Sequence, residues 1–106
     1  MNNTFPPTPR INSAMLGNHI GGHVRLVGRV ESQNSKFAVI VASDNGQVHV
    51  QMAEGAQYGT RYMEIIGVVN QDLMVSELTS TNFGDDFNLE IYNEQIIKAQ
   101  KFPNIF

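Results

Sequence analysis

The 106-residue chain has no cysteine, which excludes disulfides, thiolate zinc sites and a cysteine nucleophile. It has no tryptophan, and aromatic residues make up only 8% of it, so platforms for stacking bases are sparse. Its longest apolar run, residues 37–42, is far shorter than the roughly 20 residues that a membrane helix needs. No charged leader with an apolar segment opens the sequence. We therefore expect an intracellular protein with neither a signal peptide nor a membrane partner.

The chain also carries few charges, and the basic ones are the minority. Charged residues make up 16% of the sequence, with seven Lys and Arg against ten Asp and Glu and a formal net charge of −3. Because affinity for phosphates grows with the number of basic contacts, this balance argues against strong nucleic-acid binding by the chain alone. A role with nucleic acid is therefore expected to depend on a partner or on a small local patch. The 42% hydrophobic content is typical of a folded chain, here one small domain.

The N-terminal half of the sequence changes from an arm to strands. Residues 1–22 hold three of the four prolines, and we expect an extended arm with one short helical turn at residues 11–16. From His23 onward apolar and polar residues alternate, which predicts a half-buried strand. The apolar run 37–42 predicts a strand covered on both sides, and residues 48–52 alternate again. These three strands are expected to form a meander.

Two further strands are predicted at residues 62–69 and 73–81. Gly28 and Gly67 each lie inside an apolar strand, where a glycine costs stability and usually marks a bulge or a sharp bend. The alternative is two unrelated glycines in hydrophobic strands. Five strands with bends in the first and fourth indicate an all-β fold, a five-stranded Greek-key barrel of the OB type over residues 23–82.

Near the C-terminus the period becomes helical, and a helix of about 14 residues is expected within residues 83–106. Asp85 and Asp86 at its start, with Lys98 and Lys101 near its end, complement the helix dipole. At about 100° per residue, one stripe contains Leu89, Tyr92, Ile96, Ala99 and Gln100, with Asn93 and Ile97 along its border.

Three apolar residues lie outside this stripe: Phe87, Ile91 and Phe102. An isolated helix of this length is marginal in water, and a small barrel can cover only one side of it. The remaining apolar residues predict a second contact, most simply with the helix of another subunit. The alternative is a helix that only covers the open end of its own barrel.

No group of side chains predicts catalysis. His19 and His23 are separated by two glycines, which disfavour a helix that would bring them together, and no cysteine or carboxylate cluster accompanies them. The sequence lacks a G-x-S-x-G motif and the glycine patterns of nucleotide-binding loops. We therefore expect a non-enzyme with no metal, no cofactor and no small-molecule substrate.

Three places in the sequence match a known pattern. They are the opening Thr8-Pro9-Arg10-Ile11-Asn12 with Met15-Leu16, the Val27-Gly28-Arg29 of the first strand, and an ending with Phe87, Leu89, Ile91, Tyr92-Asn93-Glu94 and Phe102-Pro103. They occur in the right order over essentially the whole chain. In these features the chain resembles the smallest subunit of replication protein A, the eukaryotic heterotrimeric complex that binds single-stranded DNA.

The resemblance implies an OB barrel with a short N-terminal segment and a C-terminal helix through which the subunits assemble. In the family this helix packs with the equivalent helices of the middle and large subunits in a three-helix bundle. By resemblance the bundle face here consists of Leu89, Tyr92, Asn93, Ile96, Ile97 and Ala99. The resemblance also implies a nuclear heterotrimer for DNA replication, repair and recombination, in which the partners bind most of the single-stranded DNA.

A weak DNA contact by this chain itself is a further expectation, and its candidate residues are Arg25, Arg29, Lys36, Phe37 and Arg61. Surface charges that serve only solubility are the alternative. Two other functions stay open: the small OB subunit of a telomere-end-binding complex with one larger partner, and a homo-oligomeric barrel that binds nucleic acid alone. The number and identity of the partners would distinguish them.

Overall fold

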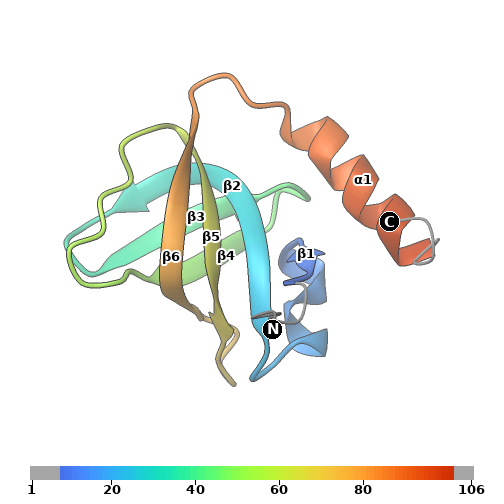
Figure 1. Ribbon diagram of the computed structural model, residues 1–106, viewed down its shortest axis with the longest axis horizontal. Helices are drawn as coiled ribbons and strands as arrows, with labels where there is room; N and C mark the ends of the chain where they lie inside the picture. Colours follow the sequence, from blue (N-terminus) through green and yellow to red (C-terminus); the bar gives the residue numbers. More distant parts are fainter. Residues whose placement is uncertain (1–7, 102–106) are drawn as a thin grey trace, which may run out of the picture.

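The computed structural model describes residues 8–101. The elements in chain order are β1 (Arg10–Ile11), the 3-10 helix η1 (Ser13–Asn18), β2 (His23–Gln33), β3 (Phe37–Ala42), β4 (Gln47–Gln51), β5 (Tyr62–Val69), β6 (Val75–Gly84) and α1 (Leu89–Lys101), as drawn in Figure 1. Expectations for residues 1–7 and 102–106, including the Phe102-Pro103 motif, lie outside the described residues.

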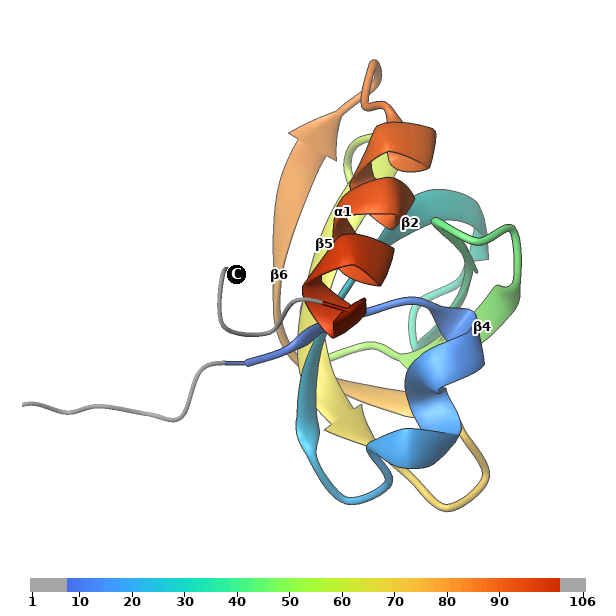
Figure 2. The same ribbon diagram turned by 90° about the vertical axis from the view of Figure 1, so that its right-hand side faces the viewer.

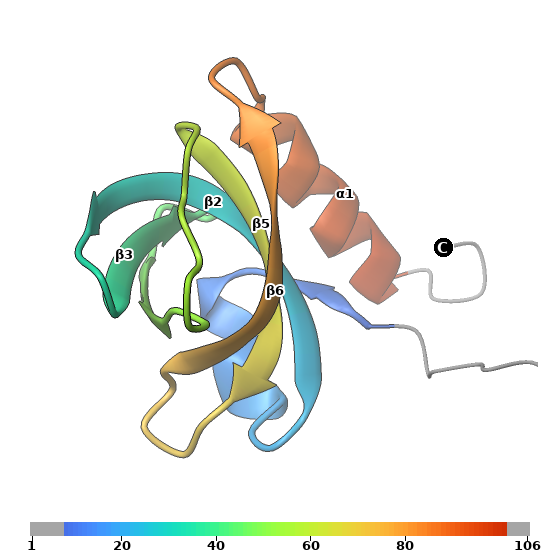
Figure 3. The ribbon, with the colours of Figure 1, turned by 60° about the vertical axis from the view of Figure 1, so that its left-hand side comes forward.

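Strand β2 closes the barrel because it pairs with two different strands. Its first part runs antiparallel to β5, with His23 opposite Val68, and its second part runs antiparallel to β3, with Gly28 opposite Ala42. Figure 3 shows the curvature that this double pairing requires. The sheet order is β1-β2-β3-β4-β6-β5 with the additional pair β2–β5. Strands β2 to β6 therefore form the five-stranded Greek-key barrel of the OB type that the alternation pattern predicts.

The sheet contains one further strand that the pattern does not predict. Residues Arg10 and Ile11 of β1 pair in parallel with Arg25 and Leu26 of β2, and Ile11 is fully buried. Two residues are too few to show any period, which is why the sequence gives no sign of a strand there. The helical turn follows this strand at Ser13–Asn18, two residues beyond the predicted position.

Both strand glycines lie where a neighbouring strand leaves no room for a Cβ atom, and one of them also marks a bulge. A Cβ atom at Gly67 would collide with the carbonyl oxygen of Ser76 in β6. At Gly67 the register of β5 against β6 shifts, which confirms the predicted bulge. At Gly28 the register is continuous, but a Cβ atom would lie 2.5 Å from the carbonyl oxygen of Val41. Because nothing larger than hydrogen fits there, glycine allows the β3 backbone to cross close to β2.

Aliphatic side chains from all five barrel strands fill the interior. The fully buried ones include Val24, Leu26, Ile40, Val48, Val50, Met63, Ile65, Val69 and Val75. They follow the period of two in β2 and β4, as expected of strands with one face in the core. Tyr58, in the loop between β4 and β5, joins this core, and its hydroxyl donates a hydrogen bond to Glu77 of β6.

Strand β6 begins and ends later than predicted. Leu73, at the expected start, has a φ of 70° and belongs to the turn, where its N–H donates to the Asn70 carbonyl at 2.9 Å. At the other end the pairing with β5 continues to Gly84, opposite Tyr62. The longer strand brings the chain out of the barrel next to the start of α1.

Helix α1 has 13 residues and begins at Leu89. Asn88 is its cap, because its side-chain oxygen accepts the N–H of Ile91 at 3.0 Å. The two aspartates expected at the helix start precede it, and Asp85 instead accepts the backbone N–H of Arg61 at 2.9 Å. None of the described helices is long and apolar enough to cross a membrane.

The segment before β2 is held to the barrel by Asp44, which follows β3. Its carboxylate accepts the Ser13 hydroxyl at 2.8 Å and the Ala14 N–H at 3.0 Å. Burial alone would raise the pKa of Asp44, but these hydrogen bonds outweigh it and lower the pKa below its ordinary value. Leu16 of η1 is buried in the core, so the N-terminal segment is part of the barrel's packing.

Candidate functional site

Helix α1 lies outside the barrel beside β1 and η1, as Figures 1 and 2 show. Asn93 in its first half connects it to two other segments. The side-chain oxygen of Asn93 accepts the Asn12 amide at 2.9 Å and the Ser43 hydroxyl at 3.0 Å. Both donors are buried, so these bonds are protected from water and fix the rotation of the helix.

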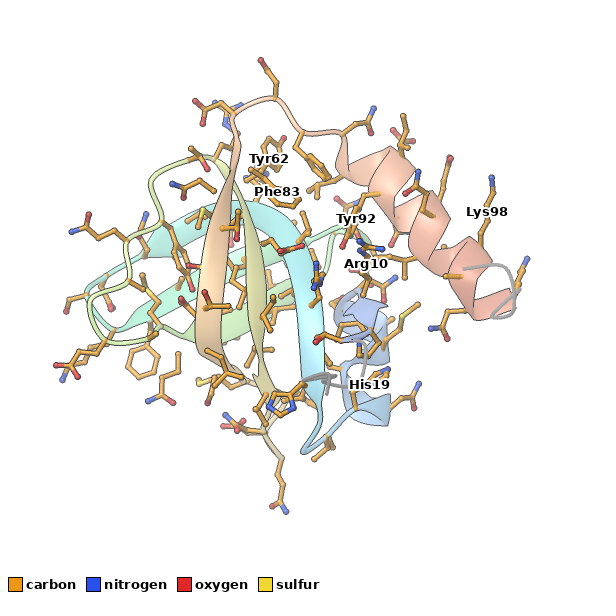
Figure 4. All side chains as sticks on the ribbon, viewed as in Figure 1. Arg10, His19, Tyr62, Phe83, Tyr92 and Lys98 are labelled. Atoms are coloured by element: carbon orange, nitrogen blue, oxygen red, sulfur yellow. The ribbon has the colours of Figure 1, made fainter. Side chains whose placement is uncertain are left out.

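Four aromatic rings join the start of α1 to the barrel. The centroid of Phe87 lies 5.2 Å from that of Phe83, 5.6 Å from that of Tyr92 and 6.1 Å from that of Tyr62. Figure 4 shows Tyr62 and Phe83 above the barrel and Tyr92 on the helix side facing it. Tilted ring pairs of this kind are stabilising, so the linker between β6 and α1 is held by contacts at both of its ends.

A groove of about 410 Å³ lies between α1 and the barrel next to these rings. Its lining consists of Arg10, Glu64, Phe83, Phe87, Asn88, Ile91, Tyr92 and Gln95. Glu64 forms an ion pair with Arg25 at 3.4 Å. Burial raises the pKa of Tyr92 to about 12, although the nearby Arg10 guanidinium opposes the shift. The Tyr92 hydroxyl is therefore neutral at physiological pH.

The residues expected to form a bundle face occupy two different environments. Ile96 is only 3% exposed within this single chain, and Leu89, Tyr92, Asn93 and Ala99 are half-buried. Ile97 is 42% exposed, and Ile91, which lies outside the predicted stripe, is 52% exposed. The chain itself thus covers Ile96 and partly covers the rest of the stripe, while two isoleucines on other sides of the helix remain uncovered.

Replacement of Asn93 by Ala should loosen α1 without unfolding the barrel. The change removes one acceptor shared by two buried donors, at a cost of about 1–3 kcal/mol. Amide hydrogen exchange in α1 should become roughly 5- to 150-fold faster, while exchange in β2 and β5 stays unchanged. Alanine has the higher helix propensity, so faster exchange would report lost docking.

The exposed Gln100 provides the matched control for this change. Replacement of Gln100 by Ala should leave hydrogen exchange in α1 at its original rate. Equal exchange rates in the two variants would show that Asn93 does not hold the helix.

The five residues expected to contact DNA lie in three different places. Arg25 pairs with Glu64 beneath α1. Arg29 and Arg61 line a different hollow, which they share with Asp85, Asp86 and Glu90. Lys36 and Phe37 lie at the turn between β2 and β3. Alternation along β2 places Arg25 and Arg29 on one face, but acidic residues from other parts of the chain accompany both.

Between residues 8 and 101 no three His, Asp or Glu side chains gather in a way that could hold a metal ion. His23 and His49 are exposed and His19 is half-buried.

Comparison with known proteins places the chain in a family. The family model described as replication factor A protein 3 matches residues 1–106. A 14 kDa replication protein A subunit of Arabidopsis thaliana is 33% identical over 104 residues, 97% of each chain. A chain in the structure of U. maydis replication protein A bound to ssDNA is 28% identical, with a TM-score of 0.92 over 97% of this chain and 98% of that one.

A chain of the S. pombe Stn1-ten1 complex is also similar, with a TM-score of 0.74 over 94% of this chain and 98% of that one. Its identity is 17%, so this likeness concerns the fold alone. The family model and the plant relative, by contrast, cover essentially the whole sequence. The chain therefore belongs to the replication factor A protein 3 family.

Proposed function

We propose that this chain is the small structural subunit of a heterotrimeric replication protein A complex, in which its partners are the large and middle subunits. The complex binds single-stranded DNA in replication, repair and recombination in the nucleus, and this subunit serves mainly in assembly. Family membership and the plant 14 kDa relative support the identity of the subunit. The U. maydis relative, whose complex is bound to ssDNA, supports the role of the complex.

The observation that carries the proposal is the position of the uncovered isoleucines on α1. At 100° per residue, Ile91 and Ile97 lie about 120° apart around the helix axis. Ile96, which is covered by the chain's own residues, lies on the remaining side. The helix thus has apolar side chains on three sides. One side is covered by the chain itself and two are exposed, which suits packing with two partner helices.

The expected bundle residues divide between two tasks in this proposal. Ile97 contacts a partner directly, together with Ile91 and the rim of the neighbouring groove at Phe87. Leu89, Tyr92, Asn93, Ile96 and Ala99 hold the helix on the barrel at the rotation that presents those residues. Isoleucines exposed in water would be covered on assembly, which favours the complex over the isolated chain.

The DNA is bound mainly by the partner subunits. This chain itself makes at most a weak contact with DNA, because its net charge is −3 and its candidate residues lie in different places. Those residues are Arg25, Arg29, Lys36, Phe37 and Arg61. No catalytic role is proposed for it.

Charged replacements at the two isoleucines test the proposed function. Ile91→Glu and Ile97→Glu should each weaken assembly by about 30-fold or more, because a carboxylate would be buried without a partner. The double variant should leave no 1:1:1 complex when the three subunits are coexpressed and analysed by native mass spectrometry. Leu78, which is 56% exposed on β6, supplies the control, and Leu78→Glu should assemble normally.

Two results would contradict the proposal, one from this experiment and one from the chain purified from its own cells. An intact 1:1:1 complex of the double variant, with unfolding curves matching the original chain, would show that α1 does not assemble through these residues. A 1:1 complex of the original chain with a single larger partner in its own cells would instead favour the telomere-end-binding alternative.

A further inference from the structure

The turn between β3 and β4 carries Asn45-Gly46, the one Asn-Gly pair in the sequence. Two backbone bonds close this turn: Asn45 donates its N–H to the Ala42 carbonyl at 2.9 Å, and Ala42 donates its N–H to the Gly46 carbonyl at 2.8 Å. Asn45 is exposed and has a φ of 68°, a left-handed conformation that asparagine tolerates well. Figure 1 shows the turn on the α1 side of the barrel, so the pair is open to water near the helix.

No hydrogen bond holds the side chain of Asn45. Among the described residues, its amide neither donates nor accepts such a bond, although the side chains on both sides of the turn do so. Asn34 provides the contrast, because it is also exposed and lies between two strands. Its side-chain oxygen accepts the N–H groups of Lys36 and Phe37, both at 2.8 Å. The amide of Asn45 can therefore turn toward the next backbone nitrogen, whereas that of Asn34 can do so only after two bonds break.

The backbone nitrogen that follows Asn45 belongs to Gly46 and is accessible. Glycine has no side chain to shield its N–H, and this N–H makes only a long bond of 3.4 Å to the Asp44 carboxylate. Asparagine is one of the thermolabile residues of proteins, because the next backbone nitrogen can attack its side-chain carbonyl carbon. The turn thus combines an unbonded amide with an unshielded nitrogen.

We propose that Asn45 is a site of spontaneous covalent modification, which converts it to aspartate and isoaspartate. The Gly46 nitrogen loses its proton to hydroxide and attacks the side-chain carbon, the bond from that carbon to the NH2 group breaks, and ammonia leaves. Water then opens the resulting cyclic imide at either of its carbonyl carbons. Opening at the side-chain carbon yields aspartate, and opening at the main-chain carbon yields isoaspartate, whose main chain continues through the former side chain. The net change is the uptake of water and the release of ammonia, without an oxidant.

Isoaspartate would disturb the contact between this turn and η1. The main chain before Gly46 becomes longer by one carbon, at a place where a Cβ atom on Gly46 would already collide with the Ser13 hydroxyl. Gly46 or Ser13 must therefore move. Ser13 is held here by the Asp44 carboxylate, which also accepts the Ala14 N–H, so these bonds are weakened. Aspartate keeps the ordinary main chain and should leave the contact in place.

The same turn is connected to α1. Ser43, two residues before Asn45, donates its hydroxyl to the side-chain oxygen of Asn93 at 3.0 Å. Asn12, next to Ser13, donates its amide to the same oxygen at 2.9 Å. Movement of the turn and of η1 therefore displaces both donors that fix the helix. The chemistry at Asn45 depends on the turn alone, so it does not rest on the proposed role in assembly.

Ageing of the full chain at mildly alkaline pH tests the modification. Samples taken over time are digested, and mass spectrometry follows the replacement of NH2 by OH at Asn45 and at Asn34, the matched control in the same chain. A parallel series in concentrated urea gives the two rates without the fold, and thus the part due to the following residues. The fold should raise the ratio of the Asn45 rate to the Asn34 rate about 30-fold over urea, because the bonds of Asn34 must break before it reacts. A ratio no higher than in urea, or an Asn45 that stays intact in the folded chain, would overturn the proposal.

Hydrogen exchange tests the consequence for α1. The isoaspartate form is separated chromatographically from the aged chain and compared with Asn45→Asp, which carries the same charge on an ordinary main chain. Amide exchange in α1 should be about tenfold faster in the isoaspartate form than in the original chain, and unchanged in Asn45→Asp. Equal exchange in the isoaspartate form and in Asn45→Asp would contradict the link between this turn and α1.

Discussion

Replacement of Gly28 by Ala should lower the free energy of unfolding by about 3 kcal/mol, at the upper end of the usual cost of overpacking. The new methyl group would lie 2.5 Å from the Val41 carbonyl oxygen, and it would also meet the side chain of Ile40 in β3. Neither group can retreat easily, because one is backbone and the other is fully buried. Strand β2 would have to move away from β3 at the place where the barrel closes.

Thermal unfolding of the purified chain measures this effect. A loss of about 3 kcal/mol in a domain of this size corresponds to a fall in Tm of roughly 15 °C. Gly17 provides the matched control, because a Cβ there meets no atom within 4 Å and its φ is not positive. Gly17→Ala should change stability by less than about 0.5 kcal/mol. Equal Tm values for the two variants would show that β3 does not approach β2 as closely as described.

Replacement of Tyr58 by Ala should lower the free energy of unfolding by about 3–5 kcal/mol, as for other large aromatic residues of a core. Tyr58 is buried in the barrel although it comes from a loop. Its hydroxyl donates to Glu77, whose carboxylate also accepts the N–H of Ala53 at 3.4 Å. The loop between β4 and β5 is thus attached to β6 through one carboxylate, and its packing depends on the ring that the change removes.

Replacement of Tyr58 by Phe removes the hydrogen bond to Glu77 but keeps the ring in the core. It should lower the free energy of unfolding by only about 1–3 kcal/mol. Burial and, next, the Glu77 carboxylate raise the pKa of Tyr58 above its ordinary value of 10. Because the folded state favours the neutral phenol, this stabilisation is complete below pH 10 and decreases as the pH rises above it. Denaturant unfolding at about pH 8 and about pH 11 gives the free energy of unfolding at each pH. Between these two values the free energy of unfolding should fall more in the original chain than in Tyr58→Phe. Equal losses would contradict the described environment of the hydroxyl.

Local patterns were enough to predict most of the barrel. Alternation of apolar and polar residues depends only on which face of a strand is buried, so it predicts β2 and β4 closely, while the apolar segments predict β3 and β5. The two-residue strand β1 was missed because its partner, Arg25-Leu26, is distant in sequence and because pairing, not period, defines it. The later start of β6 was missed because the conformation of Leu73 is fixed by the turn and not by its apolar side chain.

The candidate interface was predicted less completely, for a related reason. A helical stripe indicates that a helix has an apolar side, but it does not indicate what covers that side. Ile96 was expected to contact another subunit, and the structure covers it with residues of its own chain. Of the apolar residues outside the stripe, Ile91 is exposed, which is why the proposed second contact is assigned to it. Glu64 was not foreseen as the partner of Arg25, since the pair joins different strands.

The double pairing of β2 also has a consequence for a nascent chain on the ribosome. Strands β2, β3 and β4 can pair as soon as they emerge, since they follow one another in sequence. The edge of β2 that begins at His23 has no partner until Val68 of β5 has been translated. An unpaired edge can associate with other chains, so this protein is most exposed to misassembly while the segment between β4 and β5 is being made.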